Sequence, residues 1–440
     1  MKMTRREMLK ASAAFGAFNI IPAKVLWGAT APSNQLTRAL IGFGCIAHSD
    51  NHLPFKGSRL VGLCDPFEAR VQNGLACAEK AGWGKIKPYE NFLKILEDKG
   101  VDIVHICTPP HWHGCMSVMA AKAGKDIWCE KPMTRTVGEG KRVLEVVQAQ
   151  KRMFRLNTWF RFQGSFYGFG TTVEPIRQVV ENGLLGDGPI RCTFGAGQGF
   201  SWKFGWSGRV NEKPQPIPKG FDYEMWLGPA PWKPYTDHRV GTSFRGYWDY
   251  DSGGLGDMAQ HYLDPLQYLL CKDETSPVKI DYIGPKQHPE AVGRFDRLTL
   301  TYADGTTVDL DGDESLKEEP LLRGSNGLCV YKKAPGGKTL RLVKDGKELD
   351  AEKILSELPK PAKQQTDFID SCINRKTFAL NEANGFRSCT MFNLGIVAER
   401  LGRGFRFDPD TLHAVDDEAA ERFLYQENRM REPWKKEMFG

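Results

Sequence analysis

The sequence predicts two folded domains: an α/β domain built on a doubly wound parallel sheet, then an α+β domain with a large, mainly antiparallel sheet. Short apolar strands alternate with helical segments from Thr37 to about Trp159, which is typical of a parallel sheet with helices on both faces. A glycine-rich turn follows the first of these strands. After Trp159 the alternation stops, and an aromatic, glycine- and proline-rich region leads into further candidate strands.

Length and composition agree with this division. The chain has 440 residues, enough for two domains, and its 41% hydrophobic and 26% charged content is ordinary for a globular protein. The formal net charge of +6 is small and the lysine and arginine runs are short, so a nucleic-acid surface is not expected. We expect a leader at residues 1–31, the first domain at 32–158 and the second at 159–440.

The N-terminal segment has the features of an export signal. Residues 4–10 carry two adjacent arginines in a twin-arginine pattern, a moderately apolar stretch follows, and Ala29-Thr30-Ala31 offers a small-x-small cleavage pattern before Pro32. The segment therefore predicts export to the periplasm. A retained amphipathic helix or membrane anchor is the alternative. Three residues disfavour a stable transmembrane helix: Asn19, Pro22 and Lys24.

The eleven cysteines do not read as a disulfide framework. Their number is odd and their spacing is irregular, although an oxidising compartment would allow disulfides. Cys64, Cys107 and Cys129 fall on predicted buried strands. We expect most cysteines to be small core residues.

The elements of the first domain follow one another in a regular order. The predicted strands are Ala39–Ile41, Arg59–Cys64, Val101–Ile106, Asp126–Cys129 and Met153–Thr158. The predicted helices between them are Phe67–Ala81, Asn91–Asp98, Met116–Ala123 and Val137–Gln150. This strand–helix rhythm is what predicts the parallel sheet.

The second domain mixes its elements differently. Its predicted helices are Glu174–Asn182, which Gly183 ends, Asp257–Leu270, Lys363–Ile373 and Ala383–Leu401. Its predicted strands are Val278–Ile283, Arg297–Tyr302, Thr307–Asp311 and Gly327–Tyr331. The aromatic region, about 194–250, holds five tryptophans: Trp202, Trp206, Trp226, Trp232 and Trp248. A charged tail is expected from Phe407 to Gly440.

The turn Gly42-Phe43-Gly44-Cys45-Ile46-Ala47 indicates a dinucleotide site. It follows an apolar strand and is expected to open a helix, where glycines let backbone N–H groups approach a pyrophosphate. Asp65 ends the second strand, at a spacing suited to hydrogen bonds with the adenosine ribose. Its charge repels a 2′-phosphate, so NAD is favoured over NADP. The alternative is an ordinary strand–turn with a capping Asp.

Lys131 lies in Glu130-Lys131-Pro132, directly after the fourth strand. A lysine at the carboxyl end of a parallel strand beside a dinucleotide turn lies where substrate meets cofactor. It can stabilise an alkoxide there. Glu130 is expected to orient Lys131 or the ribose, and a cis bond before Pro132 is left open. The alternative is a surface lysine before a helix.

Asp257 and His261 follow three glycines and lie four residues apart, so they share one face of a helix. A carboxylate near an imidazole orients its tautomer and raises its basicity, as a general base requires. A capping Asp with a hydrogen-bonded core His is the alternative. His111 and His113 invite a metal hypothesis, but no metal is expected because the pair lacks acidic partners.

In this order the glycine turn, the Glu-Lys-Pro segment and the Asp-x-x-x-His helix resemble the Gfo/Idh/MocA family of nicotinamide-dependent sugar and polyol oxidoreductases. The resemblance covers nearly everything after the leader. It implies a Rossmann domain with NAD held by Gly42, Phe43, Gly44, Cys45, Ile46, Asp65, Thr108, Pro109, His113, Glu130 and Lys131. It implies that Lys131, Asp257 and His261 carry the catalysis.

The resemblance also implies oxidation or reduction of a ring hydroxyl of a sugar or glycoside, of the type that yields a 3-keto product. Candidate substrate residues are Asn157, Arg161, Trp202 and Lys203, with the other tryptophans as weaker candidates. Export favours a tightly bound NAD, and relatives pair subunits through the second sheet, so a homo-oligomer is expected. A redox-neutral glycoside hydrolase and a non-enzymatic sugar-binding or sensor protein are the alternatives.

Overall fold

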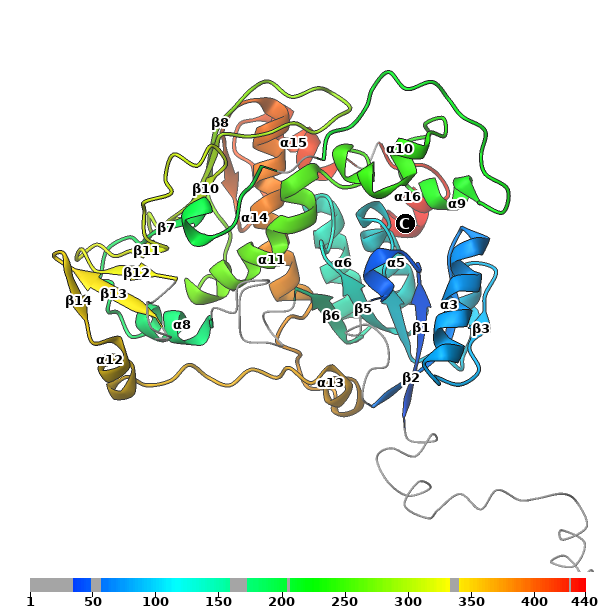
Figure 1. Ribbon diagram of the computed structural model, residues 1–440, viewed down its shortest axis with the longest axis horizontal. Helices are drawn as coiled ribbons and strands as arrows, with labels where there is room; N and C mark the ends of the chain where they lie inside the picture. The colour runs from blue at the N-terminus through cyan, green and yellow to red at the C-terminus, as the bar shows by residue number, and fades with distance from the viewer. Residues whose placement is uncertain (1–34, 49–56, 159–171, 204–205, 333–339, 427–428) are drawn as a thin grey trace, which may run out of the picture.

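The structure is a computed structural model that describes residues 35–48, 57–158, 172–203, 206–332, 340–426 and 429–440 (Figure 1). The leader and the candidate Arg161 lie outside these residues. In the described part of the chain, no helix combines the length and the apolar character that crossing a membrane requires.

The first domain is a six-stranded sheet in the order β3-β2-β1-β4-β5-β6. Its strands are β1 (Leu36–Ile41), β2 (Ser58–Cys64), β3 (Lys87–Pro88), β4 (Ile103–Ile106), β5 (Asp126–Glu130) and β6 (Phe154–Asn157). Every neighbouring pair is parallel, which confirms the predicted fold class. The order reverses between β1 and β4, where sheets of this kind bind ligands beyond the carboxyl ends of the strands.

The central strands are buried on both faces, as their continuous apolar runs predict. The connecting helices are α3 (Glu68–Lys80), α4 (Phe92–Glu97), α5 (His113–Lys122) and α6 (Val137–Ala149). Helix α5 begins three residues before the predicted start, because the 3₁₀ turn η3 (Pro110–Trp112) runs directly into it. The glycine turn leads into a 3₁₀ helix, η2 (Cys45–His48), rather than an α-helix within the described residues.

The second domain holds a ten-stranded sheet in the order β14-β13-β12-β11-β7-β10-β9-β8-β15-β16. Its strands are β7 (Arg191–Gly195), β8 (Lys279–Ile283), β9 (Arg297–Thr301), β10 (Thr307–Asp311), β11 (Leu322–Arg323), β12 (Cys329–Tyr331), β13 (Arg341–Lys344), β14 (Lys347–Leu349), β15 (Phe405–Asp408) and β16 (His413–Ala414). Only the β7–β10 pair among these is parallel, so the sheet is mixed but mostly antiparallel.

Two long helices, α11 (Gly253–Leu269) and α14 (Glu382–Leu401), lie between the large sheet and the Rossmann sheet (Figure 1). The other helical elements of this domain are α8 (Glu174–Glu181), η4 (Ala196–Gln198), α9 (Tyr223–Leu227), α10 (Asp237–Val240), η5 (Thr242–Gly246), α12 (Ala351–Glu357), α13 (Phe368–Asn374), α15 (Glu418–Tyr425) and α16 (Trp434–Phe439). Helix α14 contacts both α11 and α6, so it joins the two domains.

The segment from Phe407 to Gly440, expected as a charged tail, forms strands and helices. It contributes strands β15 and β16 to the large sheet, and then crosses to the first domain (Figure 1). Helix α16 packs beside α5, where the Trp434 ring lies 4.8 Å from that of Trp112. Arg142 donates to the carbonyls of Met438 and Gly440. The apolar Trp434 therefore helps to anchor this charged segment on helix α5 of the first domain.

Candidate active site

A cavity of about 960 Å³ opens at the carboxyl end of the parallel sheet. This is near the upper end of the range for small-molecule and cofactor sites, roughly 300–1,000 Å³. The first domain lines it with the glycine turn, Asp65 and the segment Thr108-Pro109. The aromatic region lines the opposite side with Asp222, Trp226 and Arg245, among others. The cavity therefore lies between the two domains.

The glycine turn leaves room for a ligand on one side and none on the other. Gly42 has a φ of +90°, and a Cβ on it would lie 2.8 Å from the carbonyl oxygen of Cys107, so a larger residue does not fit. A Cβ on Gly44 would meet nothing within 4 Å. The open side faces the cavity, as the close approach of a pyrophosphate requires.

Asp65 fastens the glycine turn to the loop after β2. Its carboxylate accepts hydrogen bonds from the backbone N–H groups of Phe43, at 2.8 Å, and Phe67, at 2.9 Å. Arg70 lies 3.8 Å from the same carboxylate. Burial raises the pKa of Asp65, and the Arg70 charge opposes that effect. Together with the open glycine turn, this arrangement fits an adenine dinucleotide whose ribose lies beside Asp65.

The two histidines after β4 brace loops. The ring nitrogens of His113 lie 2.6 Å from the carbonyl oxygen of Pro132 and 2.8 Å from that of Thr108. Nε2 of His111 lies 2.9 Å from the carbonyl oxygen of Trp226. Both side chains are buried and neither lines the cavity, whereas Thr108 does. Burial lowers the pKa of His111 to about 3.

Lys131 and Asp257 meet, although 126 residues separate them. Nζ of Lys131 donates to the backbone carbonyl of Asp257, at 2.7 Å, and to its Oδ1, at 3.0 Å. Nε of Arg245 also lies 3.0 Å from Oδ1. Burial alone would raise the pKa of Asp257, but Lys131 and Arg245 hold it below its usual value. Asp257 is therefore ionised, and Arg245 joins this charge cluster to the cavity.

His261 lies one turn further along α11 and is buried. Its Nδ1 lies 3.2 Å from the carbonyl oxygen of Thr158. A carbonyl only accepts, so this hydrogen bond requires the Nδ1–H tautomer, in which Nε2 carries a lone pair. Burial, helped by the Lys131 charge, lowers the pKa of His261 to about 3, so the imidazole is neutral. The structure gives Thr158 the orienting contact that the sequence assigned to Asp257.

The glycines before Asp257 allow close packing where α11 begins. The helix starts at Gly253, four residues before the predicted start. A Cβ on Gly253 would lie 2.5 Å from the Val292 side chain, and one on Gly256 would lie 2.5 Å from Oδ1 of Asp251. These residues therefore let the end of α11 that carries Asp257 approach its neighbours closely.

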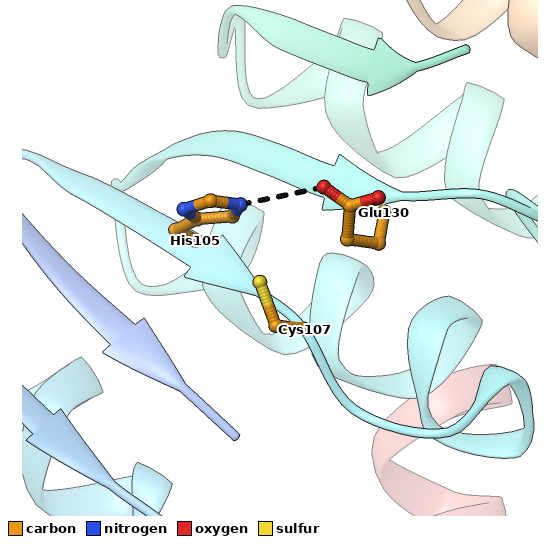
Figure 2. Close-up of side chains that lie close together, drawn as sticks. All are labelled: His105, Cys107 and Glu130. Atoms are coloured by element: carbon orange, nitrogen blue, oxygen red, sulfur yellow. Dashed lines mark ion pairs between the residues drawn. The ribbon is translucent and has the colours of Figure 1, made fainter. Parts of the chain in front are cut away.

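Glu130 belongs to a buried array on the parallel sheet, where it converges with His105 and Cys107 (Figure 2). Arg38 donates to Nδ1 of His105 at 2.7 Å, so Nε2 carries the proton and faces Glu130 at 3.6 Å. Asn157 donates to the same Glu130 oxygen at 2.8 Å. A protonated Nε2 offers no lone pair to a metal, and Arg38 is a competing cation. The arrangement favours a hydrogen-bonded array that anchors the end of β5.

The candidate substrate residues are dispersed. Trp202 is buried and its indole N–H donates to the carbonyl of Phe194. Lys203 is exposed and pairs with Glu314 at 3.2 Å. Neither lines the cavity, whereas Trp226 does. Arg245 escaped the sequence analysis, because a single arginine in an irregular aromatic stretch carries no motif.

Comparisons with known proteins cover both domains. Residues 36–158 match a family model described as "Oxidoreductase family, NAD-binding Rossmann fold". Residues 169–436 match one described as "Oxidoreductase family, C-terminal alpha/beta domain".

The ten cysteines whose side chains the structure describes are all free, and Cys64, Cys107 and Cys129 are buried as predicted.

Several curated relatives are dehydrogenases. The scyllo-inositol 2-dehydrogenase (NAD(+)) of Bacillus subtilis is 32% identical over 136 residues, which cover 30% of this chain and 38% of the relative. The levoglucosan dehydrogenase of Pseudarthrobacter phenanthrenivorans is 25% identical over 59% of this chain and 55% of its own. The D-glucoside 3-dehydrogenase of Escherichia coli is 26% identical over 35% and 42%. The matches thus span about two fifths to just over half the length of these relatives.

Solved structures share the fold across most of the chain. The aldose-aldose oxidoreductase from Caulobacter crescentus, complexed with glycerol, has a TM-score of 0.53 at 18% identity and covers 85% of this chain and 100% of its own. The WlbA dehydrogenase from Bordetella pertussis, in complex with NADH and UDP-GlcNAcA, has a TM-score of 0.53 at 15% identity over 85% and 98%. At these identities the likeness shows the fold alone.

Proposed function

The chain belongs to the Gfo/Idh/MocA oxidoreductase family, and from this premise we propose that it is an NAD-dependent dehydrogenase acting on a ring hydroxyl of a sugar or glycoside. The observation that carries the proposal is the cluster of Lys131, Asp257 and Arg245, in which Asp257 lies one helical turn from His261 and Arg245 lines the cavity. This places a cation, a carboxylate and a neutral imidazole where the carboxyl end of the sheet faces the second domain.

The residues that would hold NAD are the glycine turn, Asp65 and Thr108-Pro109, which line one cavity. NAD held there would supply the acceptor for the hydride of the substrate carbon. Asp65 supports a preference for NAD, because a 2′-phosphate would bring negative charge against its buried carboxyl group. The loop that carries Asp65 is also tied to the second domain by main-chain hydrogen bonds from Glu68 to Gly220, at 2.9 Å, and from Asp222 to Pro66, at 2.8 Å.

The chain supplies the acid–base chemistry. His261, neutral and with a lone pair on Nε2, takes the proton of the substrate hydroxyl as general base. Lys131 stabilises the negative charge that develops on the same oxygen. Asp257 and Arg245 position Lys131, since Oδ1 of Asp257 contacts both cations. In the direction of reduction, the same groups return the proton to the oxygen.

We extend the proposal to the position of oxidation, the compartment and the assembly. One relative is named for dehydrogenation of D-glucosides at position 3, which supports C3 as the reacting carbon. The twin-arginine pattern supports export to the periplasm, where a retained NAD would be an advantage. The main-chain ties that cover the Asp65 loop support slow release of the cofactor. A homo-oligomer paired through the large sheet is part of the same proposal.

The test is a substrate panel with NAD or NADP. The purified protein is offered methyl glucosides, levoglucosan and myo-inositol, and reduced cofactor is followed by its absorbance at about 340 nm. We expect reduction with NAD and a sugar substrate, and a 3-keto product by NMR. If NAD binds by calorimetry yet no panel member reduces it, the dehydrogenase proposal fails. A ketone at another carbon overturns only the C3 assignment.

A further inference from the structure

Asp251 is a buried carboxyl group beside the site that the proposed reaction leaves unused. Its side chain lies just before α11 and is 1% exposed. Neither carboxyl oxygen has a hydrogen-bond partner among the described residues. Nε of Arg245 lies 4.0 Å from its Oδ2, compared with 3.0 Å from Oδ1 of Asp257. A buried carboxylate in this position would lack the hydrogen bonds that stabilise its charge.

Asp251 and Asp257 differ in how closely they contact the neighbouring positive charges. Asp257 on α11 takes the close contacts with both Lys131 and Arg245. Asp251 faces the same charges at longer range, together with Arg135 before α6. Gly256 leaves the space that the Asp251 carboxyl group fills, since a Cβ there would lie 2.5 Å from Oδ1. Both carboxyl groups lie within 4.0 Å of Nε of Arg245, and the charge of Asp257 opposes ionisation of Asp251.

We propose that Asp251 is a neutral carboxylic acid and a positioning residue, which by staying uncharged leaves Arg245 to Asp257 and keeps the cluster around Lys131 net positive. Burial, followed by repulsion from Asp257, raises the pKa of Asp251 well above its usual value. When Asp251 ionises, it competes for Arg245 and cancels the positive charge that stabilises a developing alkoxide. This effect on the reaction rests on the proposed function, whereas the charge of Asp251 does not.

Infrared spectroscopy tests the charge without any substrate. The carbonyl stretch of a protonated carboxyl group is separate from the carboxylate bands and shifts when aspartate is labelled with carbon-13. At neutral pH we expect a label-sensitive acid band that Asp251→Asn removes and that Asp281→Asn, at a partly exposed aspartate paired with Lys279, retains. If the labelled parent protein shows no acid band at neutral pH, the proposal is overturned, and this arm needs no variant to fold.

Stability provides a second readout. An Asp whose folded pKa is raised binds its proton when the unfolded chain, with a pKa of about 3.9, has lost it. Its contribution to stability therefore falls as pH rises from about 4 toward the folded pKa. The Tm of Asp251→Asn, measured relative to the parent, should rise over that range. A relative Tm that is constant with pH, or falls, contradicts a neutral Asp251.

Kinetics then test the role. For a panel sugar that the parent oxidises, kcat/KM of the parent should decrease about tenfold per pH unit above the pKa of Asp251. In Asp251→Asn this decrease should begin at a pH at least about one unit higher. Asp257→Asn should lose activity across the whole range. An alkaline fall that is identical in the parent and Asp251→Asn overturns the positioning role. Absence of any turnover in the parent bears on the proposed function, and the infrared and stability arms still decide the charge.

Discussion

At the scale of single residues, the site depends on which groups are charged. His261 is neutral and Lys131 is held by an ionised carboxylate, so we expect His261→Ala and Lys131→Ala each to lower kcat by about 10²–10⁴-fold. NAD binding should survive, because the glycine turn, Asp65 and Thr108-Pro109, which would hold NAD, are unchanged in both variants. Calorimetry with NAD and turnover of a panel sugar provide the two measurements. Lys279→Ala, at an exposed lysine paired with Asp281, is the matched control. Near-parent turnover in either active-site variant removes that residue from the mechanism.

Cofactor preference is also set by one residue. Asp65→Ser removes the charge that repels a 2′-phosphate, and Arg70, 3.8 Å away, is already in place to attract one. We expect the ratio of NAD affinity to NADP affinity to fall by at least about tenfold, which corresponds to about 1.4 kcal/mol. Titration of the purified variant with each cofactor measures the ratio. Arg70→Ala in the same background should reverse part of the change. Equal binding of both cofactors by the unmodified protein would contradict the role of Asp65.

At the scale of elements, helix α16 holds the domains together beside the cavity. Trp434 contacts Trp112 and Phe92, and Trp112 in turn donates its indole N–H to the carbonyl oxygen of Trp226 in the cavity wall. Trp434→Ala should therefore lower the free energy of unfolding by about 2 kcal/mol, less than a fully buried tryptophan, and should speed NAD release. Urea unfolding and stopped-flow displacement measure the two effects.

The exposed Trp232 is the control for that experiment, because it is 61% exposed. Trp232→Ala should change neither the unfolding free energy nor the release rate appreciably. If Trp434→Ala destabilises the protein and leaves NAD release at the parent rate, α16 is a structural clamp without influence on the cofactor.

At the scale of the whole molecule, the proposal joins export to cofactor retention. The twin-arginine route carries folded proteins, so the first domain can cross the membrane with NAD already bound. We expect replacement of Arg5 and Arg6 by lysine to leave a folded protein in the cytoplasm, and the mature periplasmic protein to purify with NAD(H). Cell fractionation and mass analysis of the denatured protein measure both. Normal export of the double variant contradicts the signal, and a mature protein that purifies without cofactor contradicts retention.

The sequence alone determined the class of the fold and named the candidate residues of the site. The run of buried strands and the glycine turn predicted the parallel sheet, because strand periodicity and the needs of a tight turn are local properties. The ordered motifs named Lys131 and Asp257 as members of one site, and the structure places Nζ of Lys131 3.0 Å from Oδ1 of Asp257, a contact that the sequence analysis did not predict. The strands Thr307–Asp311 and Arg297–Thr301 were also found from local pattern, within one residue.

What only the tertiary structure decided concerns contacts between distant segments. No local pattern pairs Arg245 with Asp257, assigns the orientation of His261 to Thr158, or leaves Asp251 without a hydrogen-bond partner among the described residues. The same holds for the segment from Phe407 to Gly440, which was expected as a charged tail but in which Trp434 of α16 packs on Trp112 of the first domain. Charge states behave likewise, since burial and the nearest ion, rather than residue type, set whether a carboxyl group keeps its proton. Sequence therefore names the chemical groups, and the packing of the two domains decides which of them are charged and which of them meet.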